Sequence, residues 1–74
     1  MNEFYLKDDF IKLGQVLKAS GLCETGVDAK YSVTDGKVKV NGEIELQRGK
    51  KIVPGDLIEY NGKQLIIKKK EDRV

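Results

Sequence analysis

Residues 37–46 read Lys-Val-Lys-Val-Asn-Gly-Glu-Ile-Glu-Leu, and this stretch decides the fold class. Apolar and charged residues alternate on both sides of Asn41-Gly42, which is the pattern of strands that each turn one face toward a core. The Asn-Gly dipeptide favours a tight turn because both residues tolerate a positive φ angle. The stretch therefore predicts an antiparallel hairpin.

The register of this hairpin has two alternatives. A strict two-residue turn would place Val40 opposite Glu43 and mix apolar with charged side chains on one face. A bulge or a longer loop would instead pair Val40 with Ile44. The same shift would pair Val38 with Leu46 and bring all four apolar side chains into the core. We therefore expect the bulged register.

A second hairpin is predicted around Asn61-Gly62, with strands over about 56–60 and 63–68. Here the two-residue turn suits the apolar pattern, because Ile58 then faces Leu65 on a single side. The chain from residue 36 onward is therefore expected to form strands.

The N-terminal half has helical instead of alternating periodicity. A first helix is predicted over about 9–20, with a side chain of Asp8 or Asp9 capping its free amides and Gly21 ending it. Its inward stripe consists of Phe10, Leu13, Gly14 and Leu17.

A second, shorter helix is predicted over about 26–35. Thr25 has the side chain and position of an N-cap. Ala29 and Val33 lie four residues apart and form the inner pair, whereas Tyr31 projects from another side and is expected to be partly exposed.

These elements predict an α+β fold in which two helices pack on a small twisted, mostly antiparallel sheet of hairpins. Seventy-four residues make one domain, 1–74, and so small a domain buries only about 60% of the surface that its unfolded chain exposes. Residues 1–7 are expected to form a short edge strand, Pro54-Gly55 a type II turn, and residues 69–74 a flexible charged tail.

The composition argues against catalysis. Histidine is absent and Cys23 is the single cysteine, which excludes an internal disulfide, a cysteine-cluster zinc site and a Cys-His catalytic pair. The aspartates are explained by caps and turns. We therefore expect no enzyme activity, no cofactor, no metal and no small-molecule substrate.

Charge is unevenly distributed along the chain. Residues 1–35 carry four lysines against six acids, or −2, whereas residues 36–74 carry ten Lys or Arg against six acids, or +4. This asymmetry makes an anion-binding face plausible. With no apolar run long enough to cross a membrane and no signal-peptide pattern at the N-terminus, we expect a cytoplasmic protein without a membrane partner.

The motifs resemble the S-four-type RNA-binding domain, also called the alpha-L motif. Four segments carry the resemblance, which is closest to the stand-alone bacterial small proteins of that family: Leu-Gly-Gln-x-Leu-Lys at 13–18, Thr-Gly-x-x-Ala-Lys at 25–30, Val-Lys-Val-Asn-Gly-Glu at 38–43 and Arg-Gly-Lys-Lys at 48–51. Further matching positions are Gly21-Leu22, Val33, Gly36, Gly55-Asp56 and Ile58. The resemblance implies a non-catalytic protein that binds structured RNA, such as ribosomal RNA or a ribosomal particle.

Two positions depart from the widespread family pattern. Gly26 stands where many members have an Arg near the start of the second helix, and Lys30, one turn further on, is expected to supply the cation instead. Ser32 replaces a usual Leu, so this helix is expected to pack more loosely or to lean on Tyr31.

The candidate RNA-binding residues are the cations of the helices, the first hairpin and the basic loop: Lys12, Lys18, Lys30, Lys37, Lys39, Arg48, Lys50 and Lys51. Of these, the loop with Arg48, Lys50 and Lys51 around Gly49 is the strongest local candidate, because three cations lie on one short segment. Few aromatic residues accompany them, which favours recognition of RNA shape over readout of single-stranded bases. We expect a monomer. The alternative function is a small protein-interaction adaptor that uses the sheet surface.

Overall fold

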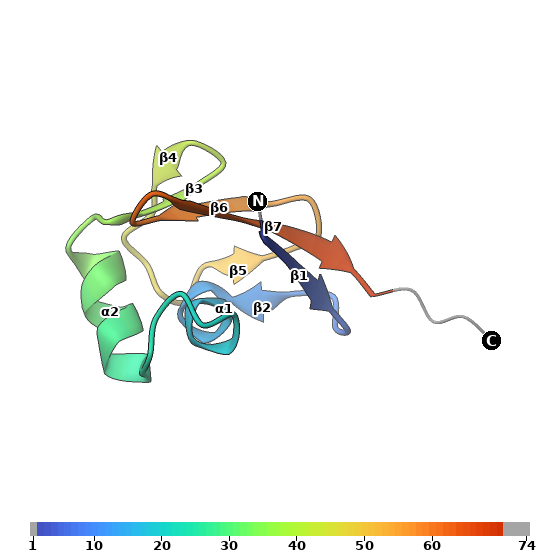
Figure 1. The fold of residues 1–74 in the computed structure, drawn as a ribbon, viewed down its shortest axis with the longest axis horizontal. Coiled ribbons are helices and arrows are strands. Elements are labelled where there is room, and N and C mark those ends of the chain that lie inside the picture. The colour runs from blue at the N-terminus through green and yellow to red at the C-terminus, as the bar shows by residue number, and fades with distance from the viewer. Residues whose placement is uncertain (1, 71–74) are drawn as a thin grey trace.

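The structure, a computed structural model, describes residues 2–70 (Figure 1). The elements follow one another as β1 (Asn2–Leu6), β2 (Ile11–Lys12), α1 (Leu13–Ala19), α2 (Gly26–Thr34), β3 (Val38–Val40), β4 (Glu43–Ile44), β5 (Lys51–Ile52), β6 (Leu57–Tyr60) and β7 (Lys63–Lys69). This α+β architecture of two helices and a mostly antiparallel sheet is the one predicted.

Five strands form the main sheet in the order β1-β7-β6-β3-β4, while β2 and β5 form a separate antiparallel pair. The hairpin strands are antiparallel, but β1 runs parallel to β7 and makes the sheet mixed. The expected N-terminal edge strand is therefore confirmed, and its partner is the last strand of the chain.

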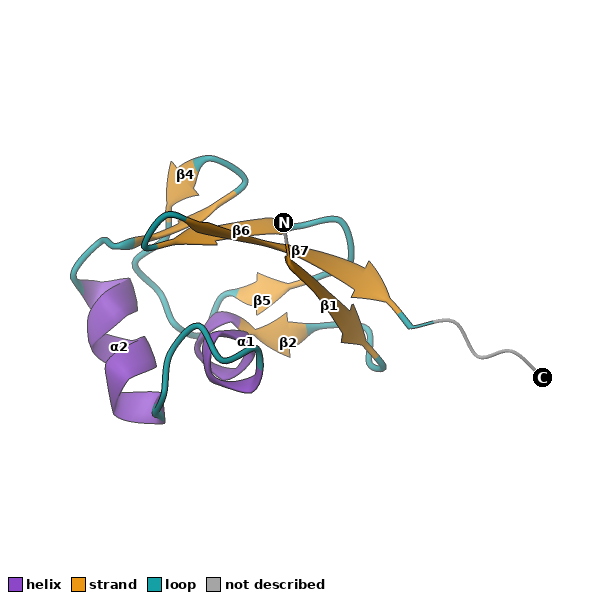
Figure 2. Ribbon diagram, in the orientation of Figure 1, coloured by secondary structure: helices purple, strands orange, loops and turns teal. Residues whose placement is uncertain are grey.

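Both helices and the β2–β5 pair lie on the same side of the main sheet (Figure 2). The core fills the space between these layers because β3, β6 and β7 turn alternate side chains toward the helices. Its fully buried larger side chains are Leu13, Val16, Leu17, Val33, Val38, Ile52, Ile58 and Ile67.

Helix α1 begins at Leu13, four residues later than predicted. Ile11 and Lys12 are extended instead and pair with Ile52 and Lys51 of β5. Lys12 is the N-cap and makes no side-chain cap. The capping role expected of Asp8 or Asp9 is thus wrong, because backbone atoms of another segment bond the first helical amides.

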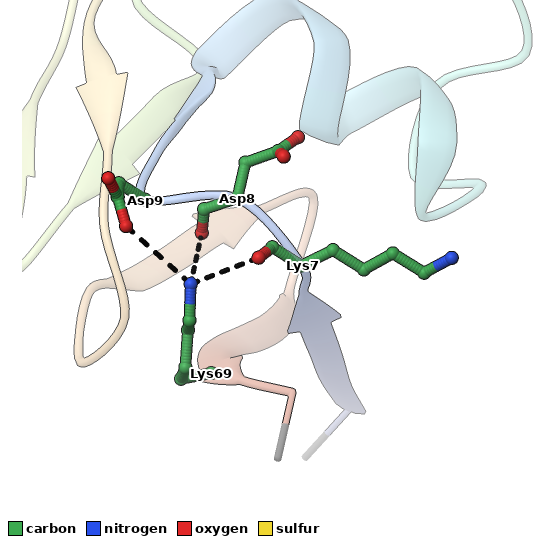
Figure 3. A network of polar contacts seen from close by, with 4 residues as sticks. All are labelled: Lys7, Asp8, Asp9 and Lys69. Carbon is green, nitrogen blue, oxygen red and sulfur yellow. Dashed lines mark hydrogen bonds and ion pairs between the residues drawn. The ribbon is translucent and has the colours of Figure 1, made fainter. Parts of the chain in front are cut away.

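Phe10 and the two aspartates occupy a turn outside the helix. Phe10, expected in the core, is 41% exposed, and the Lys51 ammonium lies 4.8 Å from the centre of its ring. The Lys69 ammonium donates to the main-chain oxygens of Lys7 and Asp8, both at 3.0 Å, and lies 3.7 Å from Oδ1 of Asp9 (Figure 3). This ammonium therefore holds the 7–9 turn against the end of β7.

Helix α2 follows its prediction closely. The Thr25 hydroxyl accepts a hydrogen bond from the amide of Asp28 at 3.1 Å, so the cap is confirmed. Ala29 and Val33 are buried as the inner pair, and Tyr31 is 59% exposed.

The expected bulge in the first hairpin is wrong. Val40 pairs with Glu43, which is the strict two-residue register, and Lys39 pairs with Ile44. Val38 and Val40 are buried as expected. Ile44, however, is 58% exposed, and so is Leu46 at 57%.

The second hairpin has the predicted register, with Ile58 opposite Leu65. The Pro54-Gly55 turn is also confirmed, because Gly55 has φ 99° and the Asp56 amide donates to the Val53 oxygen. Strand β7 includes Lys69, the first residue of the predicted tail. Residues 71–74 of that tail lie outside the described residues.

Strand β1 is tied to β7 by side chains as well as by the backbone. Glu3 forms an ion pair with Lys68, and the Tyr5 hydroxyl donates to Oε1 of Glu3 at 3.1 Å. The hydrogen bonds from Lys68 and Tyr5 lower the pKa of Glu3 below its usual 4.5, and the carboxylate raises the pKa of Lys68 above 10.5. The pair therefore favours both charged forms.

Candidate functional site

The segment before β5 caps helix α1. The Leu13 amide donates to the main-chain oxygen of Lys50, and the Gly14 amide donates to that of Arg48, both at 2.9 Å. These bonds satisfy two of the amides that every helix leaves free in its first turn. The basic loop is therefore fixed to α1 by its own carbonyl groups.

Gly14 permits this close approach. A Cβ atom at this position would lie 3.4 Å from Cβ of Arg48, at the short limit of ordinary van der Waals contact. The Leu-Gly-Gln segment thus has its glycine where the loop crosses the helix. As a result, the Arg48 side chain leaves the loop directly beside α1.

A hollow of about 370 Å³ opens between α1, the start of α2 and this loop. We call it the helix groove. Its lining consists of Lys12, Gly14, Gln15, Lys18, Gly26, Arg48 and Gly49. Three of the eight predicted site residues meet here, because the fold brings Arg48 beside the segment that carries Lys12 and Lys18.

The helix groove has no acidic residue in its lining. Within residues 2–70, both ion pairs are made by Lys68 and Lys69, so the described carboxylates leave Lys12, Lys18 and Arg48 without a partner. Like charges that converge without compensation repel one another and oppose folding, and a bound anion relieves that repulsion. The geometry and the charge together suit phosphate groups.

Gly26 is the first residue of α2, and its lack of a side chain leaves room in the helix groove. A Cβ atom there would have no neighbour within 4 Å. The position where an Arg stands in much of the family is therefore open space. Lys30, expected to replace that cation, is exposed on α2 but does not line the groove.

The remaining predicted cations lie elsewhere. Lys37 and Lys39 line a separate hollow on the main sheet, which shares no residue with the helix groove. Lys50 and Lys51 line a third hollow, where Glu43, Glu45 and Asp56 offset their charge. The basic loop is thus divided: Arg48 belongs to the helix groove, and its two lysines face acidic neighbours.

Ser32 is accommodated differently from the expectation. It is buried, and its hydroxyl donates to the Tyr60 hydroxyl at 3.0 Å, with the Cys23 sulfur 3.9 Å away. The polar side chain is satisfied by this hydrogen bond to β6. The contact that compensates for the missing Leu is therefore made with Tyr60 and not with Tyr31.

Sequence reasoning did not identify Gly14, Gln15, Gly26 and Gly49 as lining residues of the helix groove. The signal for Gln15 was present, because it lies on the outer face of α1 one turn before Lys18. The three glycines carry no side-chain chemistry, and only the fold shows that they line the groove.

Residues 2–70 have neither a cluster of metal ligands nor a membrane-spanning helix. They contain no cluster of three or more acidic, cysteine or histidine side chains placed to hold a metal ion. Neither helix in that range has the length and apolarity that spanning a membrane requires.

Comparison with known proteins gives a consistent family. The model of the S4 domain, the S-four-type domain of the motifs above, matches residues 4–68. "Putative RNA-binding protein YbcJ" of Escherichia coli is 36% identical over 56 residues, which cover 76% of this chain and 80% of YbcJ. "Probable ribosome maturation protein RlbA" of Bacillus subtilis is 34% identical over 61 residues, covering 82% and 86% of the two chains.

A solved structure has the same fold. The solution structure of E. coli YbcJ, described as revealing an αL motif involved in RNA binding, superposes with a TM-score of 0.72. The superposition covers 92% of this chain and 87% of YbcJ, with 33% sequence identity.

Proposed function

This chain belongs to the S4 domain family, and from that premise we propose that it is a non-catalytic RNA-binding protein that holds the phosphate backbone of a structured RNA in the helix groove. The observation that carries the proposal is the convergence of Lys12, Lys18 and Arg48 in one hollow without an acidic neighbour. The relatives named for RNA binding and for ribosome maturation support it.

The chemistry of the groove favours backbone contacts over base readout. Arg48 presents a planar fork of donors that matches phosphate oxygens, and the two lysines add compact point charges. The groove lining contains no aromatic residue on which a base could stack. A folded RNA, whose paired bases are hidden and whose phosphates have fixed spacing, fits such a surface best.

The name of the B. subtilis relative suggests the kind of RNA. We propose ribosomal RNA, free or within a ribosomal particle, as the partner, and the cytoplasm as the place of action. Sedimentation of the tagged protein from a bacterial lysate tests this, because it should move with ribosomal particles and return to the top of the gradient after ribonuclease treatment. Persistence of the fast-sedimenting form after complete RNA digestion would point to a protein partner.

Binding itself is tested with a fluorescent RNA hairpin at several salt concentrations. The variant Lys18→Gln with Arg48→Gln removes two groove cations, while Lys7→Gln with Lys70→Gln removes two exposed cations outside it. The logarithm of the binding constant falls with the logarithm of the salt concentration. Each lost phosphate contact should make this negative slope shallower by about 1. The groove variant should therefore lose clearly more than its charge-matched control. Equal losses would leave only nonspecific attraction.

One observation favours the adaptor as a second candidate. Ile44 and Leu46 are more than half exposed, and both lie near Gly36, where a Cβ atom would meet them at 3.7 and 3.8 Å. Two neighbouring apolar side chains, one on the edge strand β4 and one just after it, offer an apolar contact to a protein. A ribonuclease-resistant complex that Ile44→Asp abolishes would support the adaptor.

A further inference from the structure

The main sheet carries a second concentration of positive charge around β3 and the β6–β7 turn. Lys39 lies between the buried residues Val38 and Val40, so the alternation of β3 turns it away from the helices. It lines a hollow of about 460 Å³ together with Lys37 and Lys63. We call this hollow the sheet face.

The charge of the sheet face is poorly compensated. Its lining contains one carboxylate, Glu59, which pairs with Lys39 across β3 and β6. As in the helix groove, none of the three lysines takes part in an ion pair with the described residues. Three lysines against one glutamate leave a local excess of two positive charges.

Neutral donors complete this surface. Asn61 and Gln64 line the same hollow, and each side chain supplies an amide group that can donate to a phosphate or a ribose oxygen. Asn61 lies in the β6–β7 turn with φ 53°. Lysines and amides, with Tyr60 as the one aromatic lining residue, suit a phosphate backbone better than unpaired bases.

From these observations we propose that the sheet face is a second phosphate-binding surface, so that one domain holds two separate backbone segments of the same folded RNA. The inference rests on the proposed RNA-binding function. The two surfaces are distinct, because they share no lining residue and the groove is built on α1 and α2, whereas Lys39 points away from these helices. One RNA helix held in the groove leaves the sheet face free for a second segment.

The two-surface arrangement has a consequence for binding affinity. Once one segment of an RNA is bound, the other is held at a high effective concentration near the second surface. An RNA with two helical arms should therefore bind more tightly than a single hairpin of equal length. The difference should depend on the sheet face and not on the groove alone.

The test uses the intact protein with two fluorescent probes, a single RNA hairpin and a two-armed RNA junction of equal length. Lys39→Gln with Lys63→Gln alters the sheet face, and Lys7→Gln with Lys70→Gln is the charge-matched control. Circular dichroism melts check that each variant is folded. We expect the sheet-face variant to lose affinity for the junction on the order of tenfold at physiological salt. Its slope of log K against log salt should be shallower than that of the wild type by about 2. Its affinity for the hairpin should change no more than that of the control.

The outcomes separate the two proposals. If the wild type binds neither RNA at low salt, the proposed function fails. If both RNAs bind and the groove variant loses affinity, but the sheet-face variant behaves like the control on the junction, the function stands and the second surface is overturned. That same result, combined with loss of a ribonuclease-resistant protein complex, would assign the sheet face to an acidic protein instead.

Discussion

The hairpins at Asn41-Gly42 and Asn61-Gly62 have nearly the same turn geometry, and yet they contribute very differently to the core. Both asparagines have φ 53°, and the glycines have φ 85° and 76°. Each turn joins its strands in the strict two-residue register. In the second hairpin this register buries apolar residues from both strands, whereas in the first it buries those of β3 and exposes Ile44.

The bonds around Asn41 explain why the first hairpin keeps a register that its apolar pattern disfavours. Its side-chain oxygen accepts from the Leu57 amide at 2.9 Å, and its side-chain nitrogen donates to Asp56 at 3.0 Å. Its own amide donates to the Leu57 oxygen at 2.8 Å. The turn, with φ 53° at Asn41 and 85° at Gly42, is thus anchored to the start of β6 in the conformation that suits the two-residue register. Turn chemistry supported by tertiary bonds therefore outweighs the burial of two edge-strand side chains.

The largest expected effect comes from placing a carboxylate at Val40 or at Ile44, the two residues that the bulged register would pair. Val40→Asp should leave the domain largely unfolded, because an unpaired buried carboxylate costs about 4 kcal/mol or more and a domain of this size has little more to lose. Ile44→Asp should change the stability by less than about 1 kcal/mol, since that side chain is already exposed. Urea denaturation of both variants measures the difference.

Only Ile44 distinguishes the two registers, because Val40 is buried in either of them. A loss for Ile44→Asp as large as that for Val40→Asp would show that Ile44 enters the core in solution and that the bulged register is populated.

The same comparison shows what the sequence could reveal about the fold. Periodicity and turn residues were sufficient for α2, β6 and β7, because local signals and the tertiary structure agree there. They failed at the start of α1, where the capping groups are main-chain oxygens of Arg48 and Lys50, far away in the sequence. They failed again at Ile44, because the bonds of Asn41 to β6 cannot be read from the hairpin alone.

The candidate site divides in a similar way. The sequence identifies which cations exist, and the resemblance indicates what they bind. Their grouping depends on how the loop crosses α1, which brings Arg48 beside Lys18 and leaves Lys50 and Lys51 near acidic residues. Charge counting along the chain cannot separate these neighbours, because they lie within four positions of one another.

A smaller effect is expected from the glycines of the two turns. Alanine at a positive φ angle costs roughly 1–2 kcal/mol, so Gly62→Ala should lower the global stability by about that amount. Gly42→Ala should cost less than about 1 kcal/mol, because the two-residue strand β4 can fray without opening the core. Thermal melts measure both. Gly49→Ala is the control, since a Cβ atom there meets no neighbour within 4 Å and φ is not positive. Equal losses at Gly42 and Gly62 would mean that β4 is as integral to the fold as β7.

The smallest expected effect concerns the opposite edge of the sheet, where β1 has the ion pair that holds Glu3 to Lys68. Because the pKa of Glu3 is lowered below 4.5 in the folded protein, the pair stabilises the fold above that pH. The contribution is lost as the pH falls through the lowered pKa. On the alkaline side it is lost as the pH rises through the pKa of Lys68, which lies above 10.5.

Both side chains are well exposed, so the effect should be small and should weaken with added salt. The melting temperature of wild type should exceed that of Glu3→Gln near neutral pH, and the gap should close below pH 4.5, where the wild-type carboxylate also loses its charge. Lys63→Gln, which removes a charge from β7 without touching this pair, is the control and should show no such closing. A gap that stays constant through the acid range would show that the charge of Glu3 is not what stabilises the β1 edge. The two edges of the sheet would then both depend on uncharged contacts, as β4 does.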